Sequence, residues 1–258
     1  MEQTIKDFCP NRTRIRQDSN RLCQNSNFVN PFSTKFWTPG TIPYLFDKRE
    51  EWDINTLIGQ KFESGLVMQI VGSHGSGKST LLRTIMRYLE QQQQHFTIRL
   101  EVLNDRQRKL SPDFLPIRHD KNMFYMIDGY EQLSFWERFR LRFQNWSLTG
   151  GLLLTTHKPA LGIRVLYKTT PKFELFVKLV QELTKTSPAT YSDSYSDSYS
   201  DSYSYSDSFS DSFLFGTTEL QLRKIYQRAG GNFRTAFFEL YDIVQEKESQ
   251  NNVCETGT

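Results

Sequence analysis

The residues with the clearest chemical purpose form a glycine-rich segment that ends in a lysine and a serine. They match the pattern G-x-x-x-x-G-K-[ST], and they are Gly72, Ser73, His74, Gly75, Ser76, Gly77, Lys78 and Ser79. In this pattern the glycines let backbone N–H groups turn inward around phosphates. The lysine adds a cation at the β and γ phosphates, the serine hydroxyl binds Mg²⁺, and the following helix contributes its positive end. The segment and the adjacent Thr80 therefore predict a site for a nucleoside triphosphate and Mg²⁺.

Two carboxylates downstream of this loop are candidates for metal binding and catalysis. Asp128 ends the apolar run 123–128, about fifty residues after Lys78, where a carboxylate holds Mg²⁺ in proteins with such a loop. Asp128 is therefore predicted as a metal ligand together with Ser79. The next residue is Gly129, so the nearest further acid is Glu131. Glu131 could orient an attacking water, or it could only complement the dipole of the helix that follows, and both interpretations stay open.

Further polar residues stand where they could reach the phosphates. Thr155, Thr156 and His157 follow a buried apolar run, so a side chain there could lie beside the γ phosphate and sense hydrolysis. Thr156 is the candidate sensor, although hydroxyls are common at strand ends. Arg234 begins the last helix, where it could reach back to the phosphates and couple nucleotide state to the angle of a lid. An exposed arginine at a helix start is the alternative. The predicted catalytic set is thus Lys78, Glu131, Thr156 and Arg234.

The elements that must position these residues alternate along the chain. Apolar runs predict strands at 66–71, 123–128 and 151–156, an alternating pattern predicts a strand at 96–103, and 165–167 is a weaker fifth. Helical spacing predicts helices over 81–89, 136–146 and 173–183. Buried strands that alternate with helices are typical of a parallel sheet covered on both faces. The predicted fold class is therefore α/β, a three-layer P-loop sandwich with a mostly parallel sheet.

Composition divides the rest of the chain. Residues 1–29 are polar and are predicted to be a disordered arm, before a P-loop core over 30–185. Residues 186–213 carry a Tyr-Ser-Asp-Ser repeat and are predicted to be a low-complexity insertion. Residues 214–248 carry a helical apolar stripe broken by Gly230-Gly231, which predicts a small helical lid, and 249–258 are predicted to be a tail.

Bulk composition excludes several classes of protein. The 258 residues are 37% hydrophobic with a net charge of +3, which is enough for a core and too mild to favour nucleic acid. Three cysteines without metal-ligand spacing predict unpaired thiols in a reducing compartment. With no signal-peptide-like start and no run of about 20 apolar residues, the expectation is a cytoplasmic protein that makes no membrane contact.

Taken together, the loop, Asp128, the Thr155–Thr156 strand end and the Gly-Gly-Asn-Phe-Arg segment resemble the AAA+ and STAND ATPases of the additional-strand P-loop class. The stretch 128–133, Asp-Gly-Tyr-Glu-Gln-Leu, is similar to the Asp-Gly-x-acid pattern of NACHT-type ATPases. The resemblance runs from about residue 30 to 246. It implies that the loop 36–46 approaches adenine, that Thr155 or Thr156 is the sensor and that Arg234 is the lid arginine. It also implies assembly into a homo-oligomer or with another protein partner.

Other P-loop classes fit the sequence less well. No Asn-Lys-x-Asp guanine reader is present, which disfavours GTPases. ABC transporter ATPases carry an LSGGQ-like signature before the strand aspartate, whereas the faint match Leu148-Thr149-Gly150-Gly151 comes after Asp128. The expected function is therefore a slow, Mg²⁺-dependent ATPase of AAA+/STAND type that couples ATP to lid movement or assembly. The alternative is a regulatory or scaffold protein that binds the nucleotide without hydrolysing it.

Overall fold

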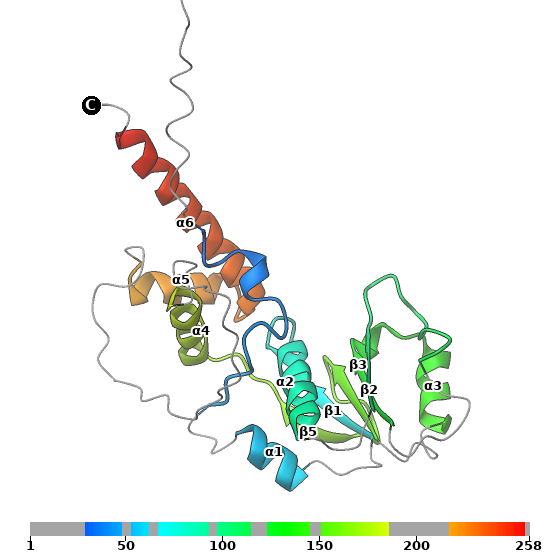
Figure 1. The fold of residues 1–258 in the computed structure, drawn as a ribbon. Coiled ribbons are helices and arrows are strands. Elements are labelled where there is room, and N and C mark those ends of the chain that lie inside the picture. Colours follow the sequence, from blue (N-terminus) through cyan, green and yellow to red (C-terminus); the bar gives the residue numbers. More distant parts are fainter. Residues whose placement is uncertain are drawn as a thin grey trace, which may run out of the picture.

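The computed structural model describes residues 29–47, 53–61, 67–92, 97–114, 123–144, 151–185 and 217–255. Within these ranges the chain forms a sheet flanked by helices, with further helices stacked beyond one end of the sheet (Figure 1). The predicted disordered arm, apart from its last residue, lies outside the described ranges. The predicted Tyr-Ser-Asp-Ser insertion lies outside them entirely.

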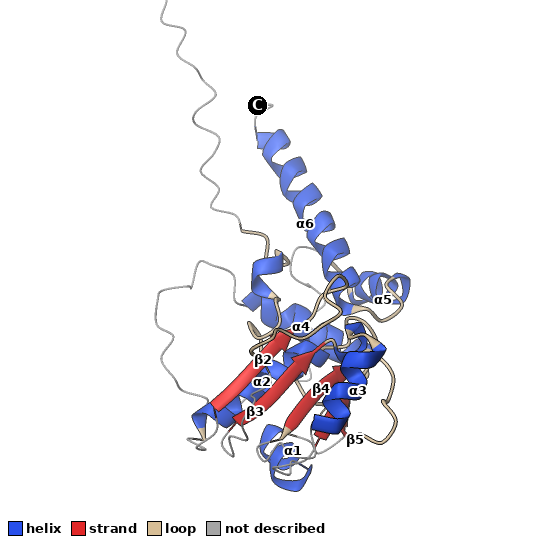
Figure 2. Cartoon of the chain, turned by 90° about the vertical axis from the view of Figure 1, so that its right-hand side faces the viewer, coloured by secondary structure: helices blue, strands red, loops and turns tan. Residues whose placement is uncertain are grey.

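Five parallel strands form the sheet, in the order β2-β3-β4-β1-β5. They are β1 (Val67–Val71), β2 (Thr97–Val102), β3 (Met123–Asp128), β4 (Leu152–Thr156) and β5 (Arg164–Lys168). The strand β4 lies between β1 and β3. Because all five strands are parallel, the loops that follow β1, β3 and β4 lie on the same side of the sheet, at the carboxyl-terminal ends of the strands (Figure 2).

The three inner strands are buried on both faces, as their continuous apolar runs predicted. Every residue of β4 is buried, and only one terminal residue each of β1 and β3 is partly exposed. The edge strand β2 is partly or fully exposed throughout, as its alternating sequence predicted. The α/β fold with a parallel sheet is confirmed.

Helices cover the two faces of the sheet in separate layers. On one face, α1 (Ile54–Lys61) and α2 (Lys78–Gln91) bury residues such as Leu57 and Leu82 in a common cluster with β1, β3, β4 and β5. On the other face, α3 (Phe135–Gln144) and the 3₁₀ turn η4 (Tyr130–Gln132) pack against the opposite side of β3 and β4. These layers form the predicted three-layer sandwich.

The helix α3 presents its aromatic stripe differently from what the sequence suggested. The spacing of Trp136, Phe139, Phe143 and Trp146 predicted an apolar face, which a helix ordinarily turns toward the core. Trp136 is instead 75% exposed and Phe139 is 46% exposed, while Leu141 faces the core at 1% exposure. The described part of the helix reaches Gln144, and position 146 of the predicted stripe lies outside the described residues. Helical periodicity identifies a stripe but does not say which neighbour, if any, covers it.

Beyond the sheet, three helices form a second apolar cluster. They are α4 (Phe173–Lys185), α5 (Glu219–Arg228) and α6 (Phe233–Glu255), and their buried residues pack around Phe176 and Phe237. The sequence-based division had placed α4 in the core and residues from 249 in a tail. In the structure α4 packs with α5 and α6, and α6 continues to Glu255, projecting away from the sheet (Figure 1). These three helices are called the lid below.

An N-terminal segment, residues 29–47, joins the lid to the sandwich. Near its start, the Asn30 side-chain amide donates to the Tyr241 carbonyl at 2.9 Å, and the Trp37 ring lies against Phe237 with centroids 5.6 Å apart. Near its end, the Tyr44 ring packs edge-on against Tyr167 of β5 at 6.0 Å. Residues 29–47 therefore contact both the lid and the sandwich, and they are called the strap.

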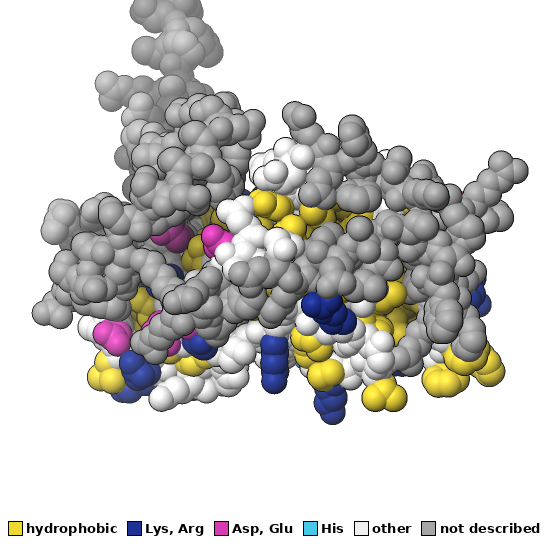
Figure 3. All heavy atoms as spheres, turned by 90° about the horizontal axis from the view of Figure 1, so that it is seen from below, with side chains coloured by type: hydrophobic (Ala, Val, Ile, Leu, Met, Phe, Trp, Pro, Cys, Tyr) yellow, Lys and Arg dark blue, Asp and Glu magenta, His cyan; other side chains and the backbone are white. Residues whose placement is uncertain are grey.

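None of the helices in the described ranges has a stretch that is both long and apolar enough to cross a bilayer. Seen from below, hydrophobic and basic side chains lie interspersed where the described residues form this face (Figure 3).

Candidate nucleotide-binding site

The glycine-rich loop connects β1 to α2 and turns its backbone through two left-handed glycines. Gly75 has φ +68° and Gly77 has φ +90°, conformations that residues with a Cβ rarely adopt. Gly77 is also the N-cap of α2, and no side chain caps the helix there. The first N–H groups of α2 therefore keep their capacity to bind an anion.

Polar contacts hold this loop in its curled shape. The Ser76 hydroxyl donates to the Ser73 carbonyl at 2.8 Å and lies 2.7 Å from the Thr169 hydroxyl, which follows β5. The Lys78 ammonium also donates to the Ser73 carbonyl at 2.8 Å. Ser76 and Thr169 are both buried. Thr169 thus helps to hold the phosphate loop in place through its contact with Ser76. Its position in the sequence did not indicate this role.

The lid rests directly against this loop. A Cβ added to Gly75 would lie 1.9 Å from Asn232 Oδ1. That oxygen caps α6 by accepting from the backbone N–H groups of Arg234 and Thr235 at 3.0 and 3.4 Å. Because Asn232 lies this close to Gly75, any side chain at position 75 would clash with it. The position therefore requires glycine for lack of space as well as for its backbone conformation.

Replacing Gly75 by alanine should therefore damage both stability and nucleotide binding. The left-handed backbone together with the clash against Asn232 should cost about 2 kcal/mol of unfolding free energy. Thermal unfolding and ATP binding measure the two effects. Gly59→Ala is the matched control, because a Cβ on Gly59 in α1 meets nothing within 4 Å. Equal unfolding temperatures for Gly75→Ala and Gly59→Ala would contradict the close approach.

Lys78 is a buried cation near two acids. Burial lowers the pKa of its ammonium group, while the charges of Glu131 and Asp128 oppose that change and Arg234 adds to it. The side chain therefore lies within electrostatic range of all three of these predicted site residues. An ammonium in such a place is stabilised further by a polyanion, as the phosphate-binding role requires.

Asp128 is oriented by the neighbouring strand. The Thr155 hydroxyl donates to Asp128 Oδ1 at 2.6 Å and accepts from the Gly129 N–H at 2.8 Å. Asp128 and the hydroxyl of Ser79 offer the hard oxygen donors that Mg²⁺ prefers. The described residues contain no cluster of three or more His, Cys, Asp or Glu that could hold a metal. One carboxylate and one hydroxyl can hold Mg²⁺ beside phosphates, so the donor set of Asp128 and Ser79 fits this ion.

The two threonines at the end of β4 point in different directions, because side chains alternate along a strand. Thr155 lies beside Asp128, whereas the Thr156 hydroxyl donates to Gln69 Oε1 at 3.1 Å. The fully buried Gln69 also holds the loop after β4, since its amide nitrogen donates to the carbonyls of Ala160 and Ile163. Thr155, rather than the predicted Thr156, therefore occupies the place beside the metal ligand.

His157, which the sequence offered only as one of three polar residues at this strand end, contacts the candidate base. Its Nε2 lies 3.0 Å from Glu131 Oε1, and its ring lies against that of His74 in the phosphate loop, with centroids 3.7 Å apart. Burial, together with the charges of Lys78 and His74, lowers the pKa of His157 to about 4. The imidazole is therefore neutral at pH 7, and its N–H can donate to the Glu131 carboxylate.

Glu131 is a partly buried carboxylate with one oxygen unused. Its Oε2 is buried and has no hydrogen-bond partner in the described part of the chain. Burial raises the pKa of this carboxyl, while its own backbone N–H and the Lys78 charge act in the opposite direction. A carboxylate with one oxygen fixed by His157 and the other free is suited to accept a proton from a water molecule.

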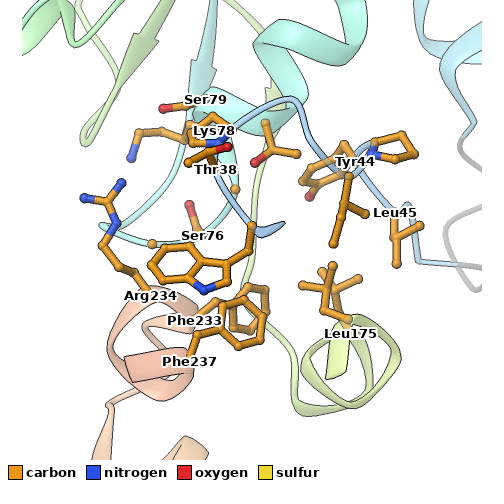
Figure 4. A pocket seen from close by; sticks show the side chains of 18 residues that line it. Thr38, Tyr44, Leu45, Ser76, Lys78, Ser79, Leu175, Phe233, Arg234 and Phe237 are labelled. Carbon is orange, nitrogen blue, oxygen red and sulfur yellow. The ribbon is translucent and has the colours of Figure 1, made fainter. Parts of the chain in front are cut away.

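A cleft between the phosphate loop, the strap and the lid completes the site. It is lined by loop residues Gly75, Ser76, Gly77, Lys78, Ser79 and Thr80, by strap residues from Trp37 to Leu45, and by Leu175, Leu179, Phe233, Arg234 and Phe237 of the lid. Lys78 and Arg234 lie at one end of the cleft, whereas Tyr44, Leu45 and Leu175 lie at the other (Figure 4). The cleft therefore has a cationic end and an apolar end.

The structure brings together most of the predicted site residues. The phosphate loop and Arg234 line one cleft, and Asp128 and Glu131 lie within electrostatic range of Lys78, although these residues come from three separate parts of the chain. Sequence reasoning did not assign functions to His157, Thr169 or Gln69. Only His157 carried a signal, as a titratable side chain directly after a buried strand.

Comparison with known proteins places this site in a family. A family model described as ABC transporter matches residues 57–192, slightly more than half of the chain, and the match includes the loop, Asp128 and His157. The sequence had favoured AAA+ over ABC ATPases because no LSGGQ-like signature precedes Asp128, whereas the family model that matches is the ABC transporter one, and the two families share the P-loop ATPase domain. No curated protein matches the sequence.

A solved structure with a similar fold is Cdc6p from Pyrobaculum aerophilum. The alignment has a TM-score of 0.53 and 13% sequence identity, and it covers 85% of this chain and 67% of Cdc6p. At that identity the likeness concerns the fold alone. The family match and the geometry of the cleft lead to one conclusion: the chain belongs to the ABC transporter family and is an ATP-binding P-loop ATPase domain.

Proposed function

We propose that the chain is a slow Mg²⁺-dependent ATPase of AAA+/STAND type, in which the state of the nucleotide sets the position of the lid. The observation that carries the proposal is the Glu131 carboxylate. It is held by His157, retains one unpartnered buried oxygen and lies near Lys78. A scaffold that only binds ATP has no need of such a group, which makes hydrolysis the better explanation.

In this proposal the triphosphate lies along the phosphate loop, with the N–H groups of α2 and the Lys78 ammonium against its oxygens. Ser79 and Asp128 would hold Mg²⁺, which supplies neutralising charge for the phosphates. Thr155 keeps Asp128 in place. Glu131 accepts a proton from the attacking water through its free oxygen, and His157 fixes the carboxylate for that transfer.

The apolar end of the cleft would receive the base. Strap residues such as Tyr44 and lid residues such as Leu175 form walls there, and adenine has flat apolar faces that fit between apolar walls. No guanine-reading motif is present in the sequence, so ATP is the proposed nucleotide. In this proposal the strap contacts the base, which is the position that the resemblance to AAA+ ATPases implies for the loop 36–46.

Movement of the lid would follow from contacts on both sides of the nucleotide. Asn232 lies against Gly75, and the Tyr226 hydroxyl of α5 donates to the Pro171 carbonyl in the β5–α4 connection at 3.0 Å. A γ phosphate that binds Arg234 would therefore bring α6 toward the phosphate loop, and its loss would remove that attraction.

Removal of Arg234 should test this coupling. Arg234→Ala should raise the KM for ATP by roughly tenfold, because one charge-assisted contact to phosphate is lost. Steady-state turnover at varied ATP measures the change. Arg223→Ala is the control, since Arg223 lies on α5 and does not line the cleft. An unchanged KM for Arg234→Ala would remove the lid arginine from the proposal.

The proposal as a whole is tested by ATP turnover of the full chain. Phosphate release should depend on Mg²⁺, should stop on chelation and should exceed GTP turnover. Tight ATP binding without phosphate release, even at high protein concentration, would contradict the ATPase proposal. It would favour the alternative, a regulatory or scaffold protein that binds the nucleotide without hydrolysing it.

A further inference from the structure

A contact between two histidine rings lies beside the candidate base. His157 follows β4 and holds Glu131, with its Nε2 3.0 Å from Glu131 Oε1. The His157 ring also lies against that of His74 in the phosphate loop, with centroids 3.7 Å apart and the ring planes tilted by 52°. The steps proposed above involve His157 and Glu131, whereas the His74 side chain has no part in them.

The two histidines meet because they follow neighbouring parallel strands. The strands β1 and β4 are paired in register, with Val71 opposite Thr156. Directly after this pair, the Gly72 N–H donates to the Thr156 carbonyl at 3.1 Å, which ties the chain leaving β1 to the end of β4. His74 comes two residues after Gly72, and His157 comes one residue after Thr156. The ring contact is therefore a consequence of strand pairing.

The backbone on both sides of His74 is held by other parts of the site. Directly before it, the Ser73 carbonyl accepts from the Lys78 ammonium at 2.8 Å. Directly after it, Gly75 lies so close to the lid that an added Cβ would be 1.9 Å from Asn232 Oδ1. The His74 side chain is exposed and is not among the groups that line the described cleft. Its ring is thus a fixed support beside the cleft.

The His157 ring needs such a support to keep Glu131 in place. The side chain of His157 is 26% exposed, and that of Glu131 is 25% exposed. A single hydrogen bond between partly exposed groups holds a ring weakly, because water can replace it. Contact with a second ring restricts the rotamers of the first. Burial above all lowers the pKa of His157 to about 4, so the ring that His74 contacts is the neutral form that donates to Glu131.

We propose that His74 is a positioning residue, whose ring holds His157 in the orientation that fixes Glu131 for proton transfer. This inference rests on the proposed function, in which Glu131 accepts a proton from the attacking water. The water oxygen bonds to the γ phosphorus as the bond from that phosphorus to the ADP oxygen breaks, and the proton goes to Glu131 Oε2. His74 exchanges no proton in this step. The loop that binds the phosphates thereby also orients the base.

Steady-state kinetics of the full chain test the proposal. His74→Ala should lower the turnover number by roughly tenfold and change the KM for ATP by less than about twofold, because the base is held loosely while the phosphate contacts remain. His74→Phe keeps a ring against His157 and should retain about half or more of wild-type turnover. Glu90→Gln is the control, since Glu90 is exposed near the end of α2 and does not line the cleft.

A double-mutant cycle shows whether His74 acts through Glu131. In the Glu131→Gln background, His74→Ala should lower the residual turnover by less than about twofold, because no base is left to position. A full effect of His74→Ala in that background would overturn the positioning role. So would His74→Phe as slow as His74→Ala, or a raised KM with an unchanged turnover number, since either result would indicate a direct contact with the nucleotide.

The same variants separate this inference from the proposed function. Wild-type turnover in Glu131→Gln would contradict the proposed base and overturn the role of His74 with it. A slow Glu131→Gln together with a fully active His74→Ala would overturn the role of His74 alone and leave the proposed function standing.

Proton NMR of the His157 ring gives a readout that does not depend on turnover. The chain has four histidines, so comparison with His157→Gln assigns the ring signals. These signals should move in His74→Ala, where the neighbouring ring and its ring current are lost, and should stay in place in Glu90→Gln. Unmoved signals in His74→Ala would show that the two rings do not touch in solution and would overturn the proposal. Thermal unfolding of each variant reports on its folding.

Discussion

Lys78→Ala should abolish measurable ATP binding and, with it, ATP turnover. The Lys78 ammonium is the loop's own cation, and it is buried within range of Glu131 and Asp128. Removing it takes away one of the cations that offset the repulsion between the triphosphate and these two carboxylates. The loss of charge-assisted contacts to two phosphates should cost about 3 to 5 kcal/mol, which weakens binding by at least about a hundredfold.

The folded state should tolerate this change, which separates binding from stability. Lys78 contributes little apolar packing, and burial disfavours its charge, so the unfolding temperature should stay equal or rise. Isothermal titration with ATP and thermal unfolding provide the two measurements. Lys185→Ala is the matched control, because Lys185 is exposed at the end of α4 and pairs only locally with Glu182. Wild-type affinity for ATP in Lys78→Ala would mean that the nucleotide does not bind at this loop.

Glu131→Gln should have the second large effect, on turnover rather than on binding. Glutamine keeps the size of the side chain and can still accept from His157, but it cannot take a proton from water. The turnover number should fall by about a hundredfold or more, with the Kd for ATP nearly unchanged. Single-turnover phosphate release and ATP titration separate the two quantities. Glu137→Gln, an acid of α3 that pairs with Arg140, is the control.

The pH dependence of turnover should identify the same group. Burial raises the pKa of the Glu131 carboxyl, so its ionised form, the one that accepts a proton, is lost at a higher pH than for an ordinary glutamate. Turnover should therefore fall as the pH drops through that raised pKa. The His157 imidazole stays neutral down to about pH 4, so its titration adds no further change in turnover above that pH. The γ phosphate also titrates, near pH 6, and the residual rate of Glu131→Gln reports that contribution alone. Identical profiles for both proteins would rule out Glu131 as the base.

Much of the sheet could be predicted from the sequence because its inner strands are buried on both faces. The runs 66–71, 123–128 and 151–156 contain almost only apolar residues, and such a run can lie only in the middle of a covered parallel sheet. The exposed aromatic side of α3 could not be predicted in the same way. The spacing of Trp136 and Phe139 shows that they share a face, but not whether any part of the fold covers it.

The family was harder to predict than the fold. The loop and Asp128 are shared by many P-loop ATPases, because binding phosphate and Mg²⁺ imposes the same residues on each of them. The sequence lacks an LSGGQ-like segment before Asp128, which favoured AAA+ over ABC ATPases, whereas the family model that matches residues 57–192 is the ABC transporter one. A single short motif weighs less than the pattern of the whole domain.

The sequence by itself determined the phosphate loop, since glycines, a lysine and a serine at fixed spacing act through a local backbone turn between one strand and one helix. It also determined that Asp128 ends a neighbouring buried strand. Only the tertiary structure decided the partners of these residues. Thr155 rather than Thr156 lies beside Asp128, His157 holds Glu131, and Asn232 of the lid lies against Gly75. Those contacts join segments between 26 and 157 positions apart in the numbering, and their geometry depends on strand order, side-chain alternation and lid docking, which no local pattern encodes.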